Sequence, residues 1–156
     1  MFVLYCITVN MPRMIKIRTP RPSEKSLWLP LWAEYCAGDC PEKTTALTWR
    51  RFHDPDEPVH ILCAYRNKKM IGFATFIFHR STWAKRRYCC LEDLFVAKPF
   101  RRKGVARRLI DSVRKQAKTA KAERLYWTTL RKNRAARALY AKFTESTDFI
   151  QYQMPL

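Results

Sequence analysis

Two acidic residues, Glu92 and Asp93, stand side by side inside the otherwise apolar run of residues 91–96. This run has the composition of a buried strand, on which neighbouring side chains point to opposite faces. A carboxylate is costly to bury without a purpose. We therefore expect Glu92 to have a chemical function. For Asp93, the binding of a cationic group and a plain ion pair with Arg86 or Arg87 remain equal alternatives.

A basic loop with one glycine follows this strand. Residues 101–106 read Arg-Arg-Lys-Gly-Val-Ala, and an amphipathic helix is predicted from Val105 to Ala120. The start of a helix offers free N–H groups and the positive end of its dipole, and Gly104 lets the backbone approach a ligand closely. The loop therefore predicts a site for phosphate or pyrophosphate. The alternative is a helix start with a solvated basic face.

The loop and the strand before it resemble a known family. Arg101, Gly104 and Ala106 occupy the fixed positions of the pyrophosphate loop of the Gcn5-related N-acetyltransferases, Arg/Gln-x-x-Gly-x-Gly/Ala. Arg102 stands where many members have glycine. The strand sequence Leu-Glu-Asp-Leu-Phe-Val resembles the branch with the spermidine/spermine and the yeast-type histone and polyamine acetyltransferases.

A second segment strengthens this resemblance. Asn133 and Tyr140 are seven residues apart, so they share one face of a helix, and the pattern Asn-x-x-Ala-x-x-Leu-Tyr resembles the family's fourth motif. The resemblance gives Tyr140 the role of protonating the leaving thiolate, since its hydroxyl is a neutral donor at pH 7. It gives Asn133 and Ala136 contacts to the cofactor. Taken alone, Tyr140 would be a core residue and Asn133 a plain helix cap.

The resemblance implies direct transfer of an acetyl group from acetyl-CoA to a primary amine, such as a polyamine or an amino-acid-like acceptor. It gives Glu92 the role of general base, often acting through water, and implies a homodimer. The implied cofactor contacts are the backbone of Leu94, Phe95 and Val96 and the loop residues Arg101, Arg102, Lys103, Gly104, Val105, Ala106 and Arg107. The candidate acceptor residues are Asp93, Tyr35, Trp49, Trp83 and Trp127.

The charge of the chain keeps another class of function open. The 156 residues carry a formal net charge of +18, and such a field attracts nucleic acid, anionic membranes or phosphate-rich cofactors. A basic module that binds nucleic acid or ribosomes is therefore the second hypothesis. An acetyltransferase that acts on a basic protein or a nucleic-acid-associated target is the third. No stretch is long and apolar enough to predict a membrane span.

The six cysteines are predicted to be reduced. Cys63, Cys89 and Cys90 lie in apolar strand-like runs, where a free cysteine acts as a small hydrophobic residue. Cys36 and Cys40 have no histidine or second cysteine pair at ligand spacing, so no metal site is expected. Free thiols favour a cytoplasmic protein.

Periodicity and turn residues predict one α/β domain over residues 14–156, after an extension of residues 1–13. The sheet should be mixed and flanked by helices, and the resemblance implies that its central strand and the following parallel strand splay apart to admit acetyl-CoA. We expect strands at residues 14–18, 60–65, 70–78, 91–96, 124–129 and 149–154, and helices at 23–36, 44–52, 105–120 and from Asn133. Asn67 is expected to take positive φ in the turn of a hairpin.

Overall fold

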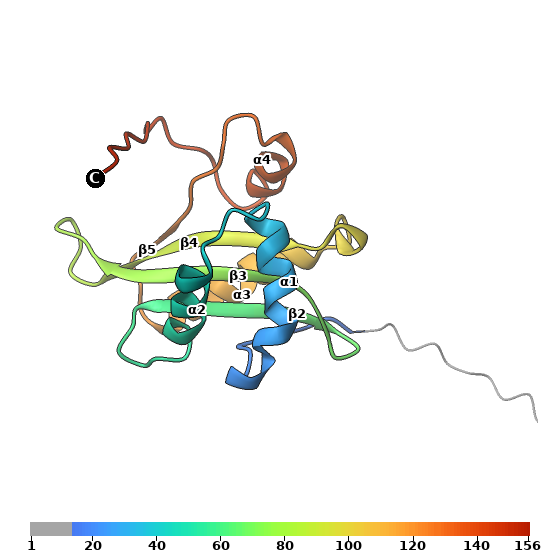
Figure 1. Cartoon of the computed structure of the whole chain (residues 1–156). Helices are drawn as coiled ribbons and strands as arrows, with labels where there is room; N and C mark the ends of the chain where they lie inside the picture. The colour runs from blue at the N-terminus through green and yellow to red at the C-terminus, as the bar shows by residue number, and fades with distance from the viewer. Residues whose placement is uncertain (1–13) are drawn as a thin grey trace, which may run out of the picture.

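The computed structural model describes residues 14–156, so the predicted extension of residues 1–13 lies outside the described part of the chain. Five strands form one sheet in the order β1-β2-β3-β4-β5. The first four pair antiparallel, and β5 runs parallel to β4 (Figure 1). The strands are β1 (Lys16–Arg18), β2 (Val59–Arg66), β3 (Lys69–Arg80), β4 (Arg87–Val96) and β5 (Arg124–Tyr126).

Helices cover both faces of this sheet. On one face lie α1 (Lys25–Tyr35), which follows the 3₁₀ turn η1 (Pro22–Glu24), and α2 (Glu42–Arg51). Their tryptophans, Trp28 and Trp49, pack on Phe73 of β3 and its neighbours. On the other face α3 (Val105–Thr119) buries a stripe that includes Leu109 and Val113. A second 3₁₀ turn, η2 (Lys98–Phe100), precedes α3, and α4 (Arg134–Tyr140) follows β5 (Figure 1).

The predicted hairpin is confirmed. Asn67 and Lys68 link β2 to β3 with φ values of 51° and 66°, which matches the turn geometry that suits the twist of paired strands. Helix α1 begins two residues later than predicted, because Ser23 lies in the 3₁₀ turn. Pro30 lies inside this helix, which continues to Tyr35.

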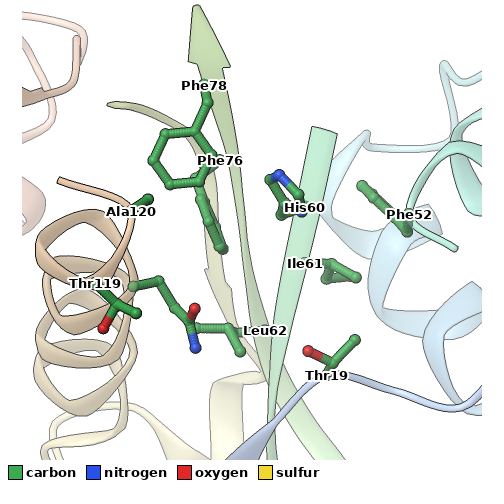
Figure 2. A pocket seen from close by; sticks show the side chains of 10 residues that line it. Thr19, Phe52, His60, Ile61, Leu62, Phe76, Phe78, Thr119 and Ala120 are labelled. Atoms are coloured by element: carbon green, nitrogen blue, oxygen red, sulfur yellow. The ribbon is translucent and has the colours of Figure 1, made fainter. Parts of the chain in front are cut away.

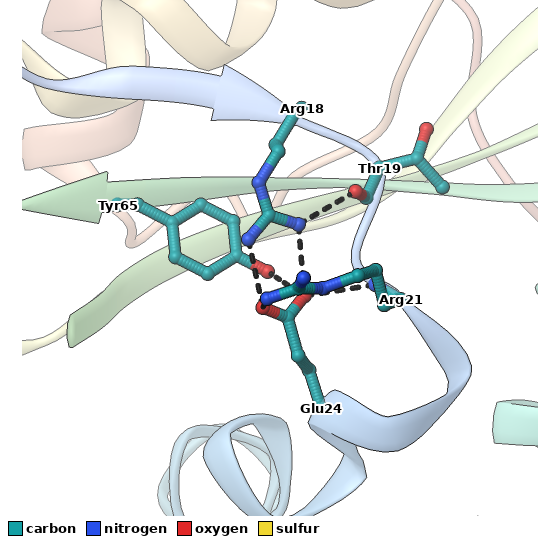
Figure 3. Close-up of polar contacts among 5 residues, drawn as sticks. All are labelled: Arg18, Thr19, Arg21, Glu24 and Tyr65. Atoms are coloured by element: carbon teal, nitrogen blue, oxygen red, sulfur yellow. Dashed lines mark hydrogen bonds and ion pairs between the residues drawn. The ribbon is translucent and has the colours of Figure 1, made fainter. Parts of the chain in front are cut away.

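A buried ion network joins β1 to the start of α1 (Figure 3). The Glu24 carboxylate, in a residue only 8% exposed, accepts hydrogen bonds from the Arg18 guanidinium at 2.7 and 2.8 Å. It also accepts the Arg21 N–H at 2.8 Å and the Tyr65 hydroxyl at 3.0 Å. These donors, the Arg18 guanidinium first, hold the pKa of Glu24 far below its usual value.

The strand predicted at residues 149–154 is wrong. Residues 144–156 form no strand, and the side chains of Phe149 and Tyr152 are each 89% exposed. The neighbouring strand β5 has only three residues and ends at Tyr126, short of the predicted Thr129. So short a strand offers few backbone groups with which a further strand could pair.

The prediction of six free cysteines is also wrong. Cys36 and Cys40 form a disulfide in the loop between α1 and α2, with their Cα atoms 5.8 Å apart. The loop can reverse direction here because Ala37 and Gly38 both adopt positive φ. The remaining cysteines of the described chain, Cys63, Cys89 and Cys90, are free as expected. Within residues 14–156, no helix has both the length and the apolar character needed to cross a bilayer.

Candidate active site

The parallel strands β4 and β5 pair over only three residues. The first pair is Tyr88 with Arg124, and the last is Cys90 with Tyr126, where β5 ends. Strand β4 continues beyond this point to Val96. The second half of β4 is therefore open on the side of β5. This is the gap that the family resemblance implies, and it leaves backbone groups of β4 available for a ligand.

The register at the far end of β4 identifies these backbone groups. The N–H of Ala97 donates to the Ile71 carbonyl of β3 at 3.0 Å. Since N–H and C=O groups alternate in direction along a strand, those of Val96 and Leu94 point to the open side. A ligand in the gap can thus form main-chain hydrogen bonds with β4, as another strand would.

A β-bulge in β4 determines where the two carboxylates lie. Thr75 of β3 pairs with Asp93, but the next residue, Phe76, pairs with Leu91, so Glu92 is an extra residue without a partner. The prediction that Glu92 and Asp93 point to opposite faces assumed a regular strand, and the bulge interrupts that regularity. The charge of Asp93 and, to a smaller extent, that of Glu92 raise the pKa of Tyr35.

Asp93 is held in place by a threonine of the neighbouring strand. Thr75 is 2% exposed, and its hydroxyl donates to the Asp93 carboxylate. The same hydroxyl oxygen accepts the Asp93 N–H at 3.1 Å. These two bonds fix the carboxylate against β3.

Glu92, in contrast, is exposed. Among the described residues, its carboxylate has one hydrogen-bond donor, the Cys90 thiol, with Sγ 3.5 Å from Oε2. A thiol is a weak donor, so most of the hydrogen-bonding capacity of Glu92 is available to water or to a ligand.

Tyr35, the last residue of α1, lies over the acidic pair. Its ring packs edge-on against Phe73 and Phe95, with centroids 5.8 and 6.0 Å apart. Burial raises the pKa of Tyr35, and the charge of Asp93 and a hydrogen bond with it raise that pKa further. The hydroxyl is therefore neutral at any physiological pH and faces the carboxylates.

Tyr140, the last residue of α4, lies near enough to Tyr35 to affect the pKa of its hydroxyl. Its ring lies 5.3 Å from that of Trp127, which follows β5 directly. Burial raises the pKa of Tyr140, so this hydroxyl also keeps its proton. Tyr140 contributes to the raised pKa of Tyr35, which brings residues of α1, β4 and α4 into one cluster.

The predicted phosphate loop has open backbone donors. Gly104 caps α3 with φ of 77°, and its carbonyl accepts the Arg108 N–H at 3.1 Å. The N–H groups of Val105, Ala106 and Arg107 come before this first helical bond and have no acceptor within the helix. Arg102, Lys103 and Arg107 are exposed around them. These groups are suited to bind an anion, which is the function that the motif predicts.

Arg101 has a structural role that its sequence position does not reveal. Its Nε donates to the Val96 carbonyl at 2.7 Å, and its guanidinium lies 3.9 Å from Glu34 of α1. The side chain therefore ties the loop to the end of β4 and uses one acceptor on the open side. What Arg101 contributes to the loop is its backbone and the position of its neighbours.

Three other predicted site residues, Asn133, Trp49 and Trp83, lie in different parts of the fold. The Asn133 side chain accepts the Ala136 N–H at 3.2 Å, so it caps α4. Trp49 lies in the core, packed against Trp28. Trp83 lies on the loop between β3 and β4 with its side chain 90% exposed, and its backbone N–H donates to the Ser81 hydroxyl at 3.2 Å.

The open side of β4 has groups of the kind that coenzyme A would need. The backbone of Leu94 and Val96 could pair with the pantetheine amides, and the N–H groups at the start of α3 could bind the pyrophosphate. Both sets of donors lie at the same end of β4, because η2 and the loop of residues 101–104 directly follow this strand. The sequence analysis named these groups as candidates. It did not name Thr75, which could have been noticed only as a polar residue within the apolar run of β3.

A separate cavity of about 230 Å³ lies near the end of α3 (Figure 2). His60 of β2 and Phe76 and Phe78 of β3 line it, together with Thr119 and Ala120. The His60 ring stacks on Phe76 with centroids 5.3 Å apart, and burial lowers the pKa of this histidine. None of the predicted catalytic or cofactor residues borders this cavity.

Comparison with known proteins agrees with this geometry. The sequence profile of the Acetyltransferase (GNAT) family matches residues 24–144. The chain belongs to this family. It is an N-acetyltransferase that uses acetyl-CoA as its acetyl donor, and the predicted α/β fold with its mixed sheet and flanking helices is confirmed.

The D-amino-acid N-acetyltransferase HPA3 of Saccharomyces cerevisiae is 30% identical over 144 residues, which cover 89% of each chain. The thialysine N-epsilon-acetyltransferase of Caenorhabditis elegans is 31% identical over 104 residues, 64% of each chain. Among solved structures, the aminoglycoside N-acetyltransferase AAC(6')-Iy in complex with CoA has a TM-score of 0.81 at 20% identity. The match covers 95% of this chain and 99% of the other.

Proposed function

We propose that this acetyltransferase acetylates the amine of a small amino-acid-like acceptor, held at Glu92, Asp93 and Tyr35. The observation that carries the proposal is the bulge in β4, which leaves Glu92 without a partner beside Asp93, and the charges of both carboxylates raise the pKa of Tyr35. Two negative charges beside an aromatic ring suit a cationic amine. The substrate named for each of the two relatives above, a D-amino acid and thialysine, carries an amino group.

Glu92 serves as the base. An amine with a pKa of about 10 is protonated at neutral pH and must lose a proton before it can attack. The Glu92 carboxylate is exposed and has only a weak thiol donor, so it can take this proton directly or through water. Asp93, fixed by Thr75, cannot turn to follow the substrate. Its role is to hold and orient the cation.

Tyr140 serves as the acid. Burial raises its pKa, so the hydroxyl has a proton to give to the leaving sulfur. Acetyl-CoA supplies an acetyl group already activated as a thioester. The open N–H groups of Leu94 and Val96 can stabilise negative charge on the acetyl oxygen, as preorganised donors do in other acyl transfers.

The acetyl group passes directly to the amine, without an acetyl-cysteine intermediate. Cys90 is the free thiol beside Glu92, and burial raises its pKa to about 11. Cys89 is buried, with its pKa raised to about 12. A thiol acts as a nucleophile only as the thiolate, so neither residue is suited to carry the acetyl group.

We further propose that the enzyme forms a homodimer, with the C-terminal segment at the interface. This segment exposes Phe149, Ile150, Tyr152, Met154 and Leu156, each at least 72% accessible in the single chain. Apolar side chains gathered in this way favour an interface between proteins. Light scattering of the full chain and of a chain ending at residue 147 tests this part, and a full-length monomer would refute it.

An acceptor panel tests the substrate assignment. Release of free coenzyme A is measured with acetyl-CoA and one acceptor at a time: D-amino acids, L-amino acids, thialysine, lysine, spermidine and a basic peptide. We expect the highest kcat/KM for an acceptor that has both an amine and a carboxylate. A preference for spermidine would replace the amino-acid class by polyamines. Turnover of a basic peptide alone would reject a small acceptor.

A further inference from the structure

The positive charge of the chain is concentrated in the segment that follows β4. Residues 98–142, which include α3 and α4, contain sixteen lysines and arginines but only two acidic residues, a net charge of +14 out of +18. Residues 19–58, which include α1 and α2, contain five basic and seven acidic residues, a net charge of −2. Helix α3 of this segment covers the face of the sheet opposite to α1 and α2 (Figure 1), so it brings part of this charge to that face.

The outer surface of α3 carries an organised part of this charge. We call Arg114, Lys115, Lys118 and Lys121 the α3 basic face, and all four are exposed. At 3.6 residues per turn, the three that lie within the helix fall within about 100° of arc. The opposite side of the helix is buried against the sheet. The charges therefore project straight outward from the protein.

Among residues 14–156, no ion pair with an acidic side chain neutralises the lysines and arginine of this face. The four ion pairs among the described residues use Arg18, Arg21, Arg51 and Arg101, none of which belongs to it. Asp111 is the single acidic residue of α3. Like charges three and four residues apart on a helix repel one another. The α3 basic face therefore has an electrostatic cost that an anionic partner would remove.

The phosphates of acetyl-CoA do not explain this face. Lys118 lies thirteen residues after Val105, or about 20 Å along the helix axis at 1.5 Å per residue. The predicted phosphate loop is at the other end of α3. Membrane binding at an interface needs apolar side chains beside the basic ones, and no large hydrophobic side chain of α3 is exposed. The chemistry of the face suits a polyanion in water.

We propose that the α3 basic face binds nucleic acid through its phosphate groups, independently of the acetyl-transfer site. Lysine and arginine contacts to phosphates position a protein without reading base sequence. Such binding depends strongly on salt, with a slope of log K against log salt of about −0.7 per phosphate contact for a single strand. Three contacts from the helix predict a contribution of about −2 to this slope.

Fluorescence anisotropy with a labelled 20-nucleotide RNA and a DNA duplex of equal length tests the proposal. The test variant carries Arg114→Glu, Lys115→Glu and Lys118→Glu. The matched control carries Lys43→Glu, Arg50→Glu and Lys85→Glu, which change the net charge equally but lie outside the face. All proteins are titrated between 50 and 200 mM salt, where the Debye length falls from about 14 to about 7 Å, with and without saturating acetyl-CoA. Sedimentation with phosphatidylserine vesicles runs in parallel, and thermal melts and acetylation of a small amine check each variant.

We expect the test variant to bind each probe at least tenfold more weakly than wild type, and the slope of log K against log salt to become less steep by about 2. The affinity of the control should stay within about threefold of wild type. Both variants should keep their acetylation activity. The RNA and DNA probes show which nucleic acid is preferred. An equal loss in the control would mean that only total charge matters and would overturn the proposal. Displacement of the RNA by acetyl-CoA, stronger binding to vesicles than to either probe, or no binding of wild type at 150 mM salt would also overturn it.

Discussion

The hydroxyl of Thr75 accepts the backbone N–H of Asp93 at 3.1 Å and donates to the carboxylate of the same residue. One buried hydroxyl on β3 thus fixes both the backbone and the side chain of the residue after the bulge. Glu92, the bulged residue, has no such restraint. Two adjacent carboxylates therefore differ in mobility, which suits one to orient a cation and the other to accept its proton.

Thr75→Val should weaken acceptor binding, because it removes the hydroxyl but keeps the shape of the side chain. We expect KM for the amine to rise about tenfold, in line with the loss of a charge-assisted hydrogen bond worth about 1.5 kcal/mol. KM for acetyl-CoA should be unchanged. Steady-state kinetics with each substrate varied checks this split. Thr75→Ser, which keeps the hydroxyl, should behave as wild type, and an equal loss in both variants would rule out the hydrogen bond as the cause.

Glu92→Gln should lower kcat/KM by about 10²–10⁴-fold, the usual contribution of a general base. The variant can act only on amine that is already neutral. Its rate should therefore keep rising with pH toward the pKa of the amine, about 10. The measurement is a pH profile of initial rates for wild type and variant. Glu145→Gln, in the exposed C-terminal segment, serves as the control. A profile parallel to that of wild type would remove Glu92 from the role of base.

Tyr140→Phe should lower kcat by about 10²-fold, because the leaving sulfur loses its proton donor. Binding of acetyl-CoA should change little, since the ring still packs on Trp127. Calorimetry for the cofactor and rapid-quench measurement of the first turnover separate binding from chemistry. Tyr152→Phe, at an exposed position, is the matched substitution. Unchanged first-turnover rates would show that Tyr140 only packs.

Glu24→Gln should destabilise the fold by about 3 kcal/mol at pH 7, as expected when one partner of a buried ion network is removed. Because the network lowers the pKa of Glu24 in the folded state, its stabilisation is complete above the unfolded pKa of about 4.3 and is lost as the pH falls below it. Urea unfolding of both proteins from pH 7 to pH 3 measures the difference. That difference should shrink steadily below about pH 4. A constant difference would mean that packing, not ionisation, is the source.

Local sequence signals were enough to predict much of this protein. The start of α3 follows from Gly104 and its basic neighbours, the hairpin from Asn67, and the cap of α4 from Asn133, because caps and turns depend on a few adjacent residues. The apolar periodicity of α3 likewise predicts which side it buries. These features place Gly104 at the start of α3 and Tyr140 on α4, as predicted.

Pairing between distant segments decided the rest. The bulge at Glu92 exists because β3 and β4 shift register opposite Thr75, and no residue of β4 alone signals that shift. The anchoring of Arg101 on Val96, the disulfide of Cys36 and Cys40, and the free C-terminal segment also depend on where the chain folds back. The sequence by itself determined which groups are available for acetyl transfer. Only the tertiary structure decided which of them meet, because the contacts that orient them join residues far apart in the chain.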